Sequence, residues 1–241
     1  MEQLSIIIPT YNERNNIIPL INQIETVLDG LNFEILIIDD NSPDQTWDLI
    51  FDTYSKKENI RAFKRITSKG LVKSLEHGVK NSQGEILVFM DGDFSHPPKT
   101  IVDLISKLDS FDIAIASRYA NGGVDGRDQV KFHRLLSKLI SHIFKYSTGL
   151  PIRDITSGFF AIHKSKLKPL RGGYGEYFID LISNLFHQGA KIVEVPYTNK
   201  NRKYGISKSG TNSLELIIRG IPYLLMIFKH SKFVRYILGS R

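Results

Sequence analysis

The chain has 241 residues, of which 41% are hydrophobic and 24% are charged, and these ordinary values exclude wholesale disorder. It contains no cysteine, which excludes a disulfide framework and thiolate metal sites and fits a reducing compartment. The net charge of +7 is uneven, because residues 197–241 carry nine Lys or Arg against one Glu, a balance of +8 that leaves about −1 elsewhere. This basic end favours an anionic partner such as a phosphate, a nucleic acid or an acidic membrane surface, and a solvated charged face is the alternative.

Strand-like and helix-like patterns alternate through the first half of the chain. Short apolar runs rich in Ile predict buried strands at residues 4–8, 33–38, 60–65, 86–90 and 112–116. Apolar residues at helical spacing predict helices at residues 16–28, 47–54, 71–80 and 99–108. This alternation predicts an α/β fold with a doubly wound, mostly parallel sheet and flanking helices.

The pattern changes after residue 119. The sequence predicts a glycine-rich loop at residues 121–126, an amphipathic helix at about 131–146, a strand at 154–162, a helix at 177–186 and a strand at 191–195. A basic loop at residues 199–209 is suited to ordering over a bound phosphate. No repeat or inter-domain linker is apparent.

The two ends of the chain bear on its relation to membranes. The first residues have no basic segment and lead directly into a strand, so no signal peptide is expected. Residues 214–238 are apolar but interrupted by charges, and their longest uncharged run, 220–228, is far shorter than the about 20 residues that span a bilayer. We therefore expect no transmembrane helix there, but an interfacial helix whose basic residues reach anionic lipid; a helix packed on the core is the alternative.

The segment at residues 85–98, EILVFMDGDFSHPP, carries the strongest chemical signal. Its apolar run ends in Asp91 and Asp93, and carboxylates at the mouth of a buried strand need a cation or hydrogen-bond donors. Mg²⁺ is one such partner, since one or two carboxylates and substrate phosphates often hold it. The alternative is a polar turn in which Ser95 caps a helix opened by Pro97 and Pro98.

Other predicted strand ends carry similar residues. In doubly wound sheets ligands bind outside the carboxyl ends of the strands. Acidic residues follow the first two strands, and an arginine follows the fifth. Gathered with Asp91 and Asp93 at one edge, they indicate a site for a nucleotide and a metal.

The chain resembles the family 2 glycosyltransferases of GT-A fold and, within them, the polyprenyl-phosphate (dolichol-phosphate) mannosyltransferases. The matching motifs occur in family order over roughly residues 1–208: IPTYNERNNI (8–17), IIDDNSPDQT (37–46), MDGDFSHPP (90–98), SRYANGG (117–123), DITSGFFAI (154–162), EVPY (194–197) and RKYGISK (202–208). The resemblance implies a catalytic domain at residues 1–210 and a basic amphipathic segment at 211–241 that contacts a membrane surface.

The resemblance also implies roles for individual residues. It places Asp91 and Asp93 on a Mg²⁺ or Mn²⁺ ion, and Ser95 where relatives often have a Gln that joins the metal. It implies that the nucleotide-sugar contacts are Pro9, Tyr11, Glu13, Asp39, Asp40, Asp91 and Arg202. It implies that the acceptor phosphate is held by Arg118, Arg134 and Ser137. The catalytic set is then Asp91, Asp93, Arg118, Arg134 and Arg202. Sugar-pocket positions are Asp154, Thr156, Ser157 and Asp180, where Asp180 replaces the usual Glu.

The implied reaction is inverting transfer of mannose from GDP-mannose to a polyprenyl (dolichyl) monophosphate. The acceptor phosphate is already anionic, so we expect it to attack directly, without a catalytic base, and to give a β-linked product. The implied setting is the cytoplasmic face of a membrane, as a peripheral protein, with a small membrane subunit as a further partner.

Other activities remain open at this point. The nearest is transfer of glucose or another sugar from a UDP-sugar to the same acceptor. A phosphatase of the haloacid-dehalogenase type shares the Asp-x-Asp, but normally on its first strand. A non-catalytic membrane- or nucleotide-binding module is a further alternative. No nucleic-acid partner is expected, since no recognition motif accompanies the basic end.

Overall fold

The computed structural model describes residues 3–126, 131–204 and 213–237; for residues 131–134, 136, 213–217 and 219 it gives the backbone alone. The strands are β1 (Leu4–Thr10), β2 (Phe33–Asp39), β3 (Ile60–Lys64), β4 (Ile86–Phe89), β5 (Ile113–Ser117), β6 (Val124–Asp125), β7 (Phe160–His163), β8 (Ile192–Pro196) and β9 (Thr198–Asn199). The helices are α1 (Arg14–Val27), α2 (Thr46–Tyr54), α3 (Leu71–Asn81), α4 (Thr100–Ile105), α5 (Lys131–Thr148), α6 (Tyr177–His187), α7 (Ser213–Lys229) and α8 (Lys232–Ile237), with a 3₁₀ turn at Lys164–Lys166.

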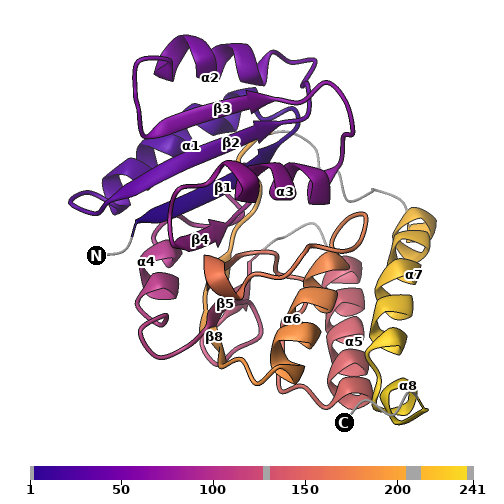
Figure 1. Ribbon diagram of the computed structural model, residues 1–241. Coiled ribbons are helices and arrows are strands. Elements are labelled where there is room, and N and C mark those ends of the chain that lie inside the picture. Colours follow the sequence, from indigo (N-terminus) through magenta and orange to yellow (C-terminus); the bar gives the residue numbers. More distant parts are fainter. Residues whose placement is uncertain (1–2, 127–130, 205–212, 238–241) are drawn as a thin grey trace.

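Seven strands form one central sheet in the order β3-β2-β1-β4-β7-β5-β8 (Figure 1). All neighbours pair in parallel except β7, which runs antiparallel to both β4 and β5. A separate parallel pair joins β6 to β9. The expected α/β fold with a mostly parallel sheet and flanking helices is confirmed.

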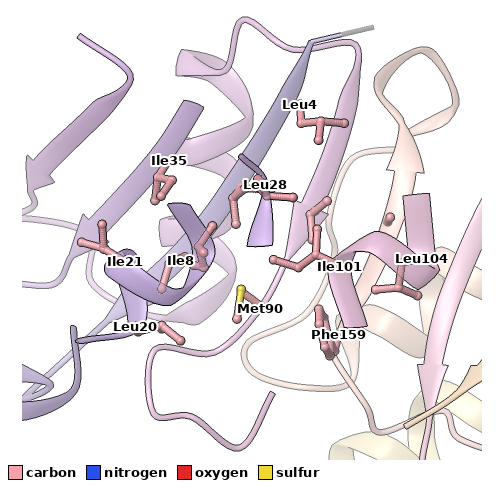
Figure 2. Packing of buried hydrophobic residues seen from close by; sticks show 14 of the residues in the cluster. Leu4, Ile8, Leu20, Ile21, Leu28, Ile35, Met90, Ile101, Leu104 and Phe159 are labelled. Carbon is pink, nitrogen blue, oxygen red and sulfur yellow. The ribbon is translucent and has the colours of Figure 1, made fainter. Parts of the chain in front are cut away.

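Both faces of the sheet are covered by apolar side chains that alternate along each strand. In β1, Ile6 and Ile8 face the cluster beneath α1 and α4, whereas Ile7 faces the cluster that includes α3 and α6. Figure 2 shows the first cluster, in which Leu20 and Ile21 of α1 lie near the sheet residues. Strands buried on both faces explain the near-continuous apolar runs of the sequence.

The second half of the chain adds a helical layer. Helix α7 packs against α5 and α6, and α8 contacts both α5 and α7 (Figure 1). None of the described helices is both long and apolar enough to cross a bilayer.

Two local predictions are wrong. Residues 154–159 do not form a strand: Gly158 adopts a φ of +67°, and β7 begins only at Phe160. The turn separates the polar residues before it from the strand that enters the sheet. The alternative in which Ser95 caps a helix also fails, because α4 begins at Thr100 and Lys99 occupies the N-cap position.

Candidate active site

The carboxyl ends of β1, β2, β4 and β5 lie at one edge of the sheet. These four strands point the same way, since β7 is antiparallel to both of its neighbours. The strands end beside Thr10, Asp39, Met90 and Ser117, so the predicted acidic and basic residues gather at this edge. The edge is also where ligands bind in open α/β sheets.

A cavity of about 190 Å³ opens at this edge. Six of the residues that the sequence singled out line it: Pro9, Asp91, Ser95, Arg118, Thr156 and Ser157. Its wall also contains polar and aromatic residues to which no role was assigned from the sequence: His96, Tyr174, Tyr177, Tyr197, Asn199 and Tyr223. The cavity therefore joins the Asp-x-Asp turn, the end of β5 and the residues that precede β7.

The two carboxylates of the Asp-x-Asp differ in their surroundings. The Asp91 side chain is 54% exposed at the cavity. Asp93 is buried, and its Oδ2 lies 2.7 Å from Nη2 of Arg202, whose Nη1 donates to Glu13 Oε1 at 2.9 Å. Although burial favours the neutral acid, the Arg202 guanidinium holds the pKa of Asp93 below its usual value. Arg202 thus links Glu13, which follows β1, to Asp93, which follows β4.

The basic segment after β9 lies along the Asp-x-Asp turn. The backbone N–H of Lys203 donates to the carbonyl of Asp93, and that of Lys200 donates to the carbonyl of Ser95, both at 3.2 Å. The Lys203 ammonium also lies 5.1 Å from the ring centre of Phe94. These contacts place Arg202 beside the carboxylates of Asp93 and Glu13. Residues 205–209 of the predicted loop lie outside the described residues.

Arg118 is held in a buried network. Its Nε donates to Asp154 Oδ2 at 2.8 Å, and its Nη2 donates to Asp154 Oδ1 and to Thr156 Oγ1, each at 2.6 Å. Nη1 lies 3.9 Å from Asp125 Oδ2. Ser137 of α5 lies beside Nη2 as well, with Oγ 3.5 Å from that nitrogen and 2.6 Å from Thr156 Oγ1. The structure therefore brings Arg118, Ser137, Asp154 and Thr156 together, with the charge of Arg118 largely balanced by carboxylates.

The acidic residues after β2 have their oxygens engaged within the chain. Asp39 is fully buried and accepts hydrogen bonds from the hydroxyl of Thr10 and from the N–H and hydroxyl of Ser42. Asp40 pairs with Arg65 Nη1 at 2.6 Å and accepts the N–H of Gly70. Both carboxylates therefore shape the loops that border the edge of the sheet.

The remaining predicted nucleotide contacts flank the start of α1. Tyr11 is 42% exposed. Glu13 is buried and accepts hydrogen bonds from Arg202 and from Asn16 Nδ2.

Asp180 and Arg134 are the remaining predicted site residues. The Asp180 side chain is buried, and its carboxylate contacts Lys229 and His230 of the α7 end, both through Oδ1, and Asn184 through Oδ2. It thereby ties α6 to α7. Arg134 belongs to the first turn of α5, but its side chain lies outside the described ones.

Sequence reasoning missed two cavity residues that the structure makes prominent. His96 is buried, and its Nδ1 accepts the backbone N–H of Asp91 at 3.0 Å. Tyr223 reaches the cavity from α7, and its hydroxyl lies against Gly175, where a Cβ would collide with it. His96 stands within the motif and could have been considered; no sequence signal connects Tyr223 to the distant Gly175.

The donor set fits a hard divalent cation that shares its coordination with a substrate. Among the described residues no group of three or more His, Cys, Asp and Glu forms a complete protein cage. Asp91 and Asp93 supply two carboxylates beside a cavity, and Mg²⁺ or Mn²⁺ takes its other ligands from phosphate oxygens and water in such sites.

Comparison with known proteins supports the assignment of the fold. Among solved structures, glucosyl-3-phosphoglycerate synthase from Mycobacterium tuberculosis in complex with Mn²⁺ and UDP-glucose superimposes with a TM-score of 0.72 at 17% identity, covering 95% of this chain and 79% of that one. The same synthase in complex with UDP gives a TM-score of 0.69 at 18% identity, covering 94% and 80% of the two chains. The GT-A fold predicted from the sequence is confirmed.

Sequence comparison gives the family. A dolichol-phosphate mannosyltransferase from Pyrococcus furiosus is 38% identical over 93% of this chain, which spans 64% of that protein's length. A polyprenol monophosphomannose synthase from Mycolicibacterium smegmatis is 31% identical over 89% of this chain and 84% of that protein's length. The family model described as glycosyl transferase family 2 matches residues 5–171. The chain therefore belongs to glycosyl transferase family 2.

Proposed function

We propose that this protein transfers mannose from GDP-mannose to a polyprenyl (dolichyl) monophosphate, giving a β-linked polyprenyl mannosyl phosphate and GDP. The observation that carries the proposal is that two groups of residues lie at one cavity. One is the Asp91 and Asp93 carboxylate pair with Arg202, and the other is Arg118 with its polar network. A site for a nucleoside diphosphate next to a site for a second anion suits transfer between two phosphate-bearing substrates. The names of the two curated relatives support mannose and a polyprenol acceptor.

The carboxylates would hold the donor end of the reaction. Asp91 and Asp93 would bind Mg²⁺ or Mn²⁺, which neutralises charge on the departing nucleoside diphosphate. Arg202 pairs with Asp93 and with Glu13, and its planar fork suits bidentate hydrogen bonds to diphosphate oxygens. Pro9, Tyr11 and Glu13 border the expected place of the nucleoside.

The network around Arg118 would hold the acceptor end. Asp154 holds one edge of the guanidinium through Nε and Nη2, and the hydroxyls of Ser137 and Thr156 lie next to it. Together with Arg134, these groups would orient the acceptor phosphate so that its oxygen attacks the anomeric carbon. Because that phosphate is anionic at neutral pH, orientation and charge stabilisation supply the rate without a general base.

The helical layer would rest on a membrane that carries the acceptor. Exposed apolar side chains occur on all three packed helices: Leu135, Leu139, Ile143 and Tyr146 of α5, Ile218, Ile221, Leu224, Leu225 and Phe228 of α7, and Phe233, Tyr236 and Ile237 of α8. Lysines and arginines stand among them, as in interfacial helices. We place this surface, which we call the α5–α7–α8 face, on the cytoplasmic leaflet, where a small membrane subunit would be a further partner.

The test is a transfer assay with radiolabelled GDP-mannose and, in parallel, UDP-glucose, using a polyprenyl phosphate in membranes, with Mg²⁺, Mn²⁺ or EDTA. Label that enters the lipid phase from GDP-mannose and is abolished by EDTA is expected. Label from UDP-glucose alone would keep the mechanism and overturn the donor. Asp93→Asn should abolish transfer while the protein remains folded by circular dichroism, and metal-independent transfer by this variant would contradict the site.

A further inference from the structure

His96 has a fixed orientation on the wall of the cavity. Its ring is 3% exposed and stacks on Phe159, with centroids 4.7 Å apart and an interplanar angle of 14°. The ring of Tyr197 meets it edge-on at 6.1 Å. Phe159 precedes β7 and Tyr197 follows β8, so two distant segments hold the plane of the imidazole.

Both nitrogens of the ring lie near Asp91. Nδ1 accepts the backbone N–H of Asp91 at 3.0 Å, and an accepting nitrogen carries no proton. The neutral ring therefore carries its proton on Nε2. That nitrogen lies 3.8 Å from Oδ2 of Asp91, close enough that a small rotation of the carboxylate completes a second hydrogen bond.

The turn that carries Asp91 and Asp93 needs such support. Phe94 adopts a φ of +68°, a left-handed conformation that is costly for a residue with a Cβ. The turn is anchored after this point by the N–H of Ser95, which donates to Asp93 Oδ1, and by the segment at Lys203. His96 anchors the part of the turn that precedes Phe94, by its hydrogen bond with the backbone of Asp91.

We propose that His96 is a positioning residue for Asp91: it fixes the backbone of Asp91 through Nδ1 and offers the Nε2 proton to Oδ2 of the Asp91 carboxylate. The proposal rests on the metal-binding role assigned to Asp91 in the proposed function. Groups that orient metal-binding side chains in this way typically contribute 10- to 100-fold to metal affinity.

Three substitutions at one position separate positioning from packing. His96→Phe keeps a flat ring against Phe159 and removes both nitrogens. His96→Asn places an amide oxygen near the position of Nδ1 and retains the acceptor for Asp91. His96→Gln places its amide near Nε2 and leaves the Asp91 N–H unpaired. His163→Phe is the matched control, because His163 pairs with Ile86 at the opposite end of β4 and bonds the carbonyl of Leu108.

The readout is the Kd for Mn²⁺, measured by the free-ion electron paramagnetic resonance signal with GDP present, together with the midpoint of thermal unfolding. We expect His96→Phe and His96→Gln to weaken Mn²⁺ binding roughly tenfold or more. His96→Asn should stay within about threefold of the unsubstituted protein, as partial rescue by one retained hydrogen bond implies. His163→Phe should not change the Kd. Equal affinity in His96→Phe and the unsubstituted protein, or equal losses in His96→Asn and His96→Phe, would overturn the proposal.

A second readout needs no metal. Nitrogen chemical shifts of histidine in the unsubstituted protein should show an unprotonated Nδ1 and a protonated Nε2 for His96, with a low-field Asp91 amide proton that moves upfield in His96→Phe. The opposite tautomer would contradict the proposal. A protein that binds Mn²⁺ as expected but transfers no sugar would contradict the proposed function alone, whereas failure of the histidine variants to change the Kd would contradict this inference alone.

Discussion

Arg118 and Asp154 form the most deeply buried ion pair around the cavity. Asp154 is inaccessible to solvent and receives two guanidinium hydrogen bonds and the backbone N–H of Arg118. Removing one partner of such a pair leaves an uncompensated buried charge. Arg118 is therefore both a scaffold residue and a candidate for binding the acceptor phosphate, and the two roles require separate measurements.

We expect Arg118→Met to lower the free energy of unfolding by about 3–5 kcal/mol, the cost of breaking a buried pair. The double variant Arg118→Met with Asp154→Leu should recover much of this loss in urea unfolding, because the orphaned carboxylate is gone. If Arg118 also grips the acceptor, the double variant will retain a raised KM for polyprenyl phosphate. Recovery of stability together with a normal acceptor KM would reduce Arg118 to a scaffold role.

Arg202 gives the complementary prediction for the donor. Its guanidinium bridges Glu13 and Asp93, and its side chain is 22% exposed. Arg202→Lys keeps the charge but loses the fork, so we expect the KM for the nucleotide-sugar to rise roughly tenfold, the worth of about one charged hydrogen bond. The acceptor KM should stay unchanged, and Lys200→Ala, an exposed neighbour, is the control. A rise confined to the acceptor KM would reverse the assignment.

Among the elements, the strands and helices of the first half follow directly from the sequence. Their apolar runs and helical stripes predicted each element to within a few residues, because strands buried on both faces and helices buried on one leave distinct patterns. The antiparallel insertion of β7 between β4 and β5 has no such signature. Apolar periodicity does not give strand direction, and the turn at Gly158 was read as part of the strand.

The contact between α7 and the loop before α6 yields an element-scale prediction. A Cβ on Gly175 would collide with the hydroxyl of Tyr223, so Gly175→Ala should push Tyr223 out of the cavity wall. We expect an increased acceptor KM and reduced protection of α7 amides from hydrogen exchange. Adding Tyr223→Ala removes the collision and should restore amide protection in α7. Unchanged exchange in Gly175→Ala would show that Tyr223 can move away without loosening the helix.

The junction of α6 with α7 is expected to weaken in acid. Burial and the neighbouring Lys229 and Arg235 hold the pKa of His230 below its usual value even though Asp180 opposes them. The folded state then binds fewer protons than the unfolded state below pH 6.5, so the free energy of unfolding falls as pH drops through that value. The pKa of His187 is lowered by burial, Arg235 and His230, with the same sign.

Asp180 contributes in a lower pH range. Its pKa is held below the usual value, against burial, by Lys229 and His230, so its stabilising effect is present above about pH 4 and is lost on further acidification. Urea unfolding at pH 7 and pH 5.5 isolates the histidine contribution. His230→Gln should reduce the difference between the two pH values, whereas His142→Gln, at an exposed position on α5, should not. An unchanged difference in His230→Gln would contradict this account.

At the scale of the whole molecule, the site gathers residues that are far apart in the chain. The Asp-x-Asp, the residues after β1 and Arg118 were predicted to meet because strand ends of a parallel sheet share one edge, whereas Arg202 was expected there from the family resemblance. The sequence did not reveal that Asp39 and Asp40 would be engaged within the chain, or that Asp180 would bind the end of α7. Such choices depend on loop geometry and on helix packing, which side-chain chemistry alone does not determine.

The α5–α7–α8 face is expected to bind anionic membranes. Leu225 and Phe228 are 64% and 59% exposed, and lysines at positions 229 and 232 adjoin them, so the face offers apolar insertion together with attraction to anionic lipid. We expect the protein to sediment with vesicles that contain phosphatidylglycerol, more weakly with pure phosphatidylcholine, and less at high salt. Leu225→Asp with Phe228→Asp should lower the binding constant roughly tenfold or more, since each inserted side chain contributes about 1.5–3 kcal/mol when fully buried.

The matched control is Phe51→Asp with Ile66→Asp. These residues are 51% and 71% exposed, but they belong to α2, which lies at the opposite end of the molecule from α8 (Figure 1), and to the segment after β3, so neither is part of the α5–α7–α8 face. If vesicle binding depends only on total surface hydrophobicity, both double variants should bind equally weakly. If it depends on the α5–α7–α8 face, only Leu225→Asp with Phe228→Asp should weaken it. Transfer to a short, water-soluble prenyl phosphate should remain intact in the α7 variant, because this acceptor reaches the cavity without a membrane. Loss of this soluble reaction would show that the substitutions damage the cavity itself.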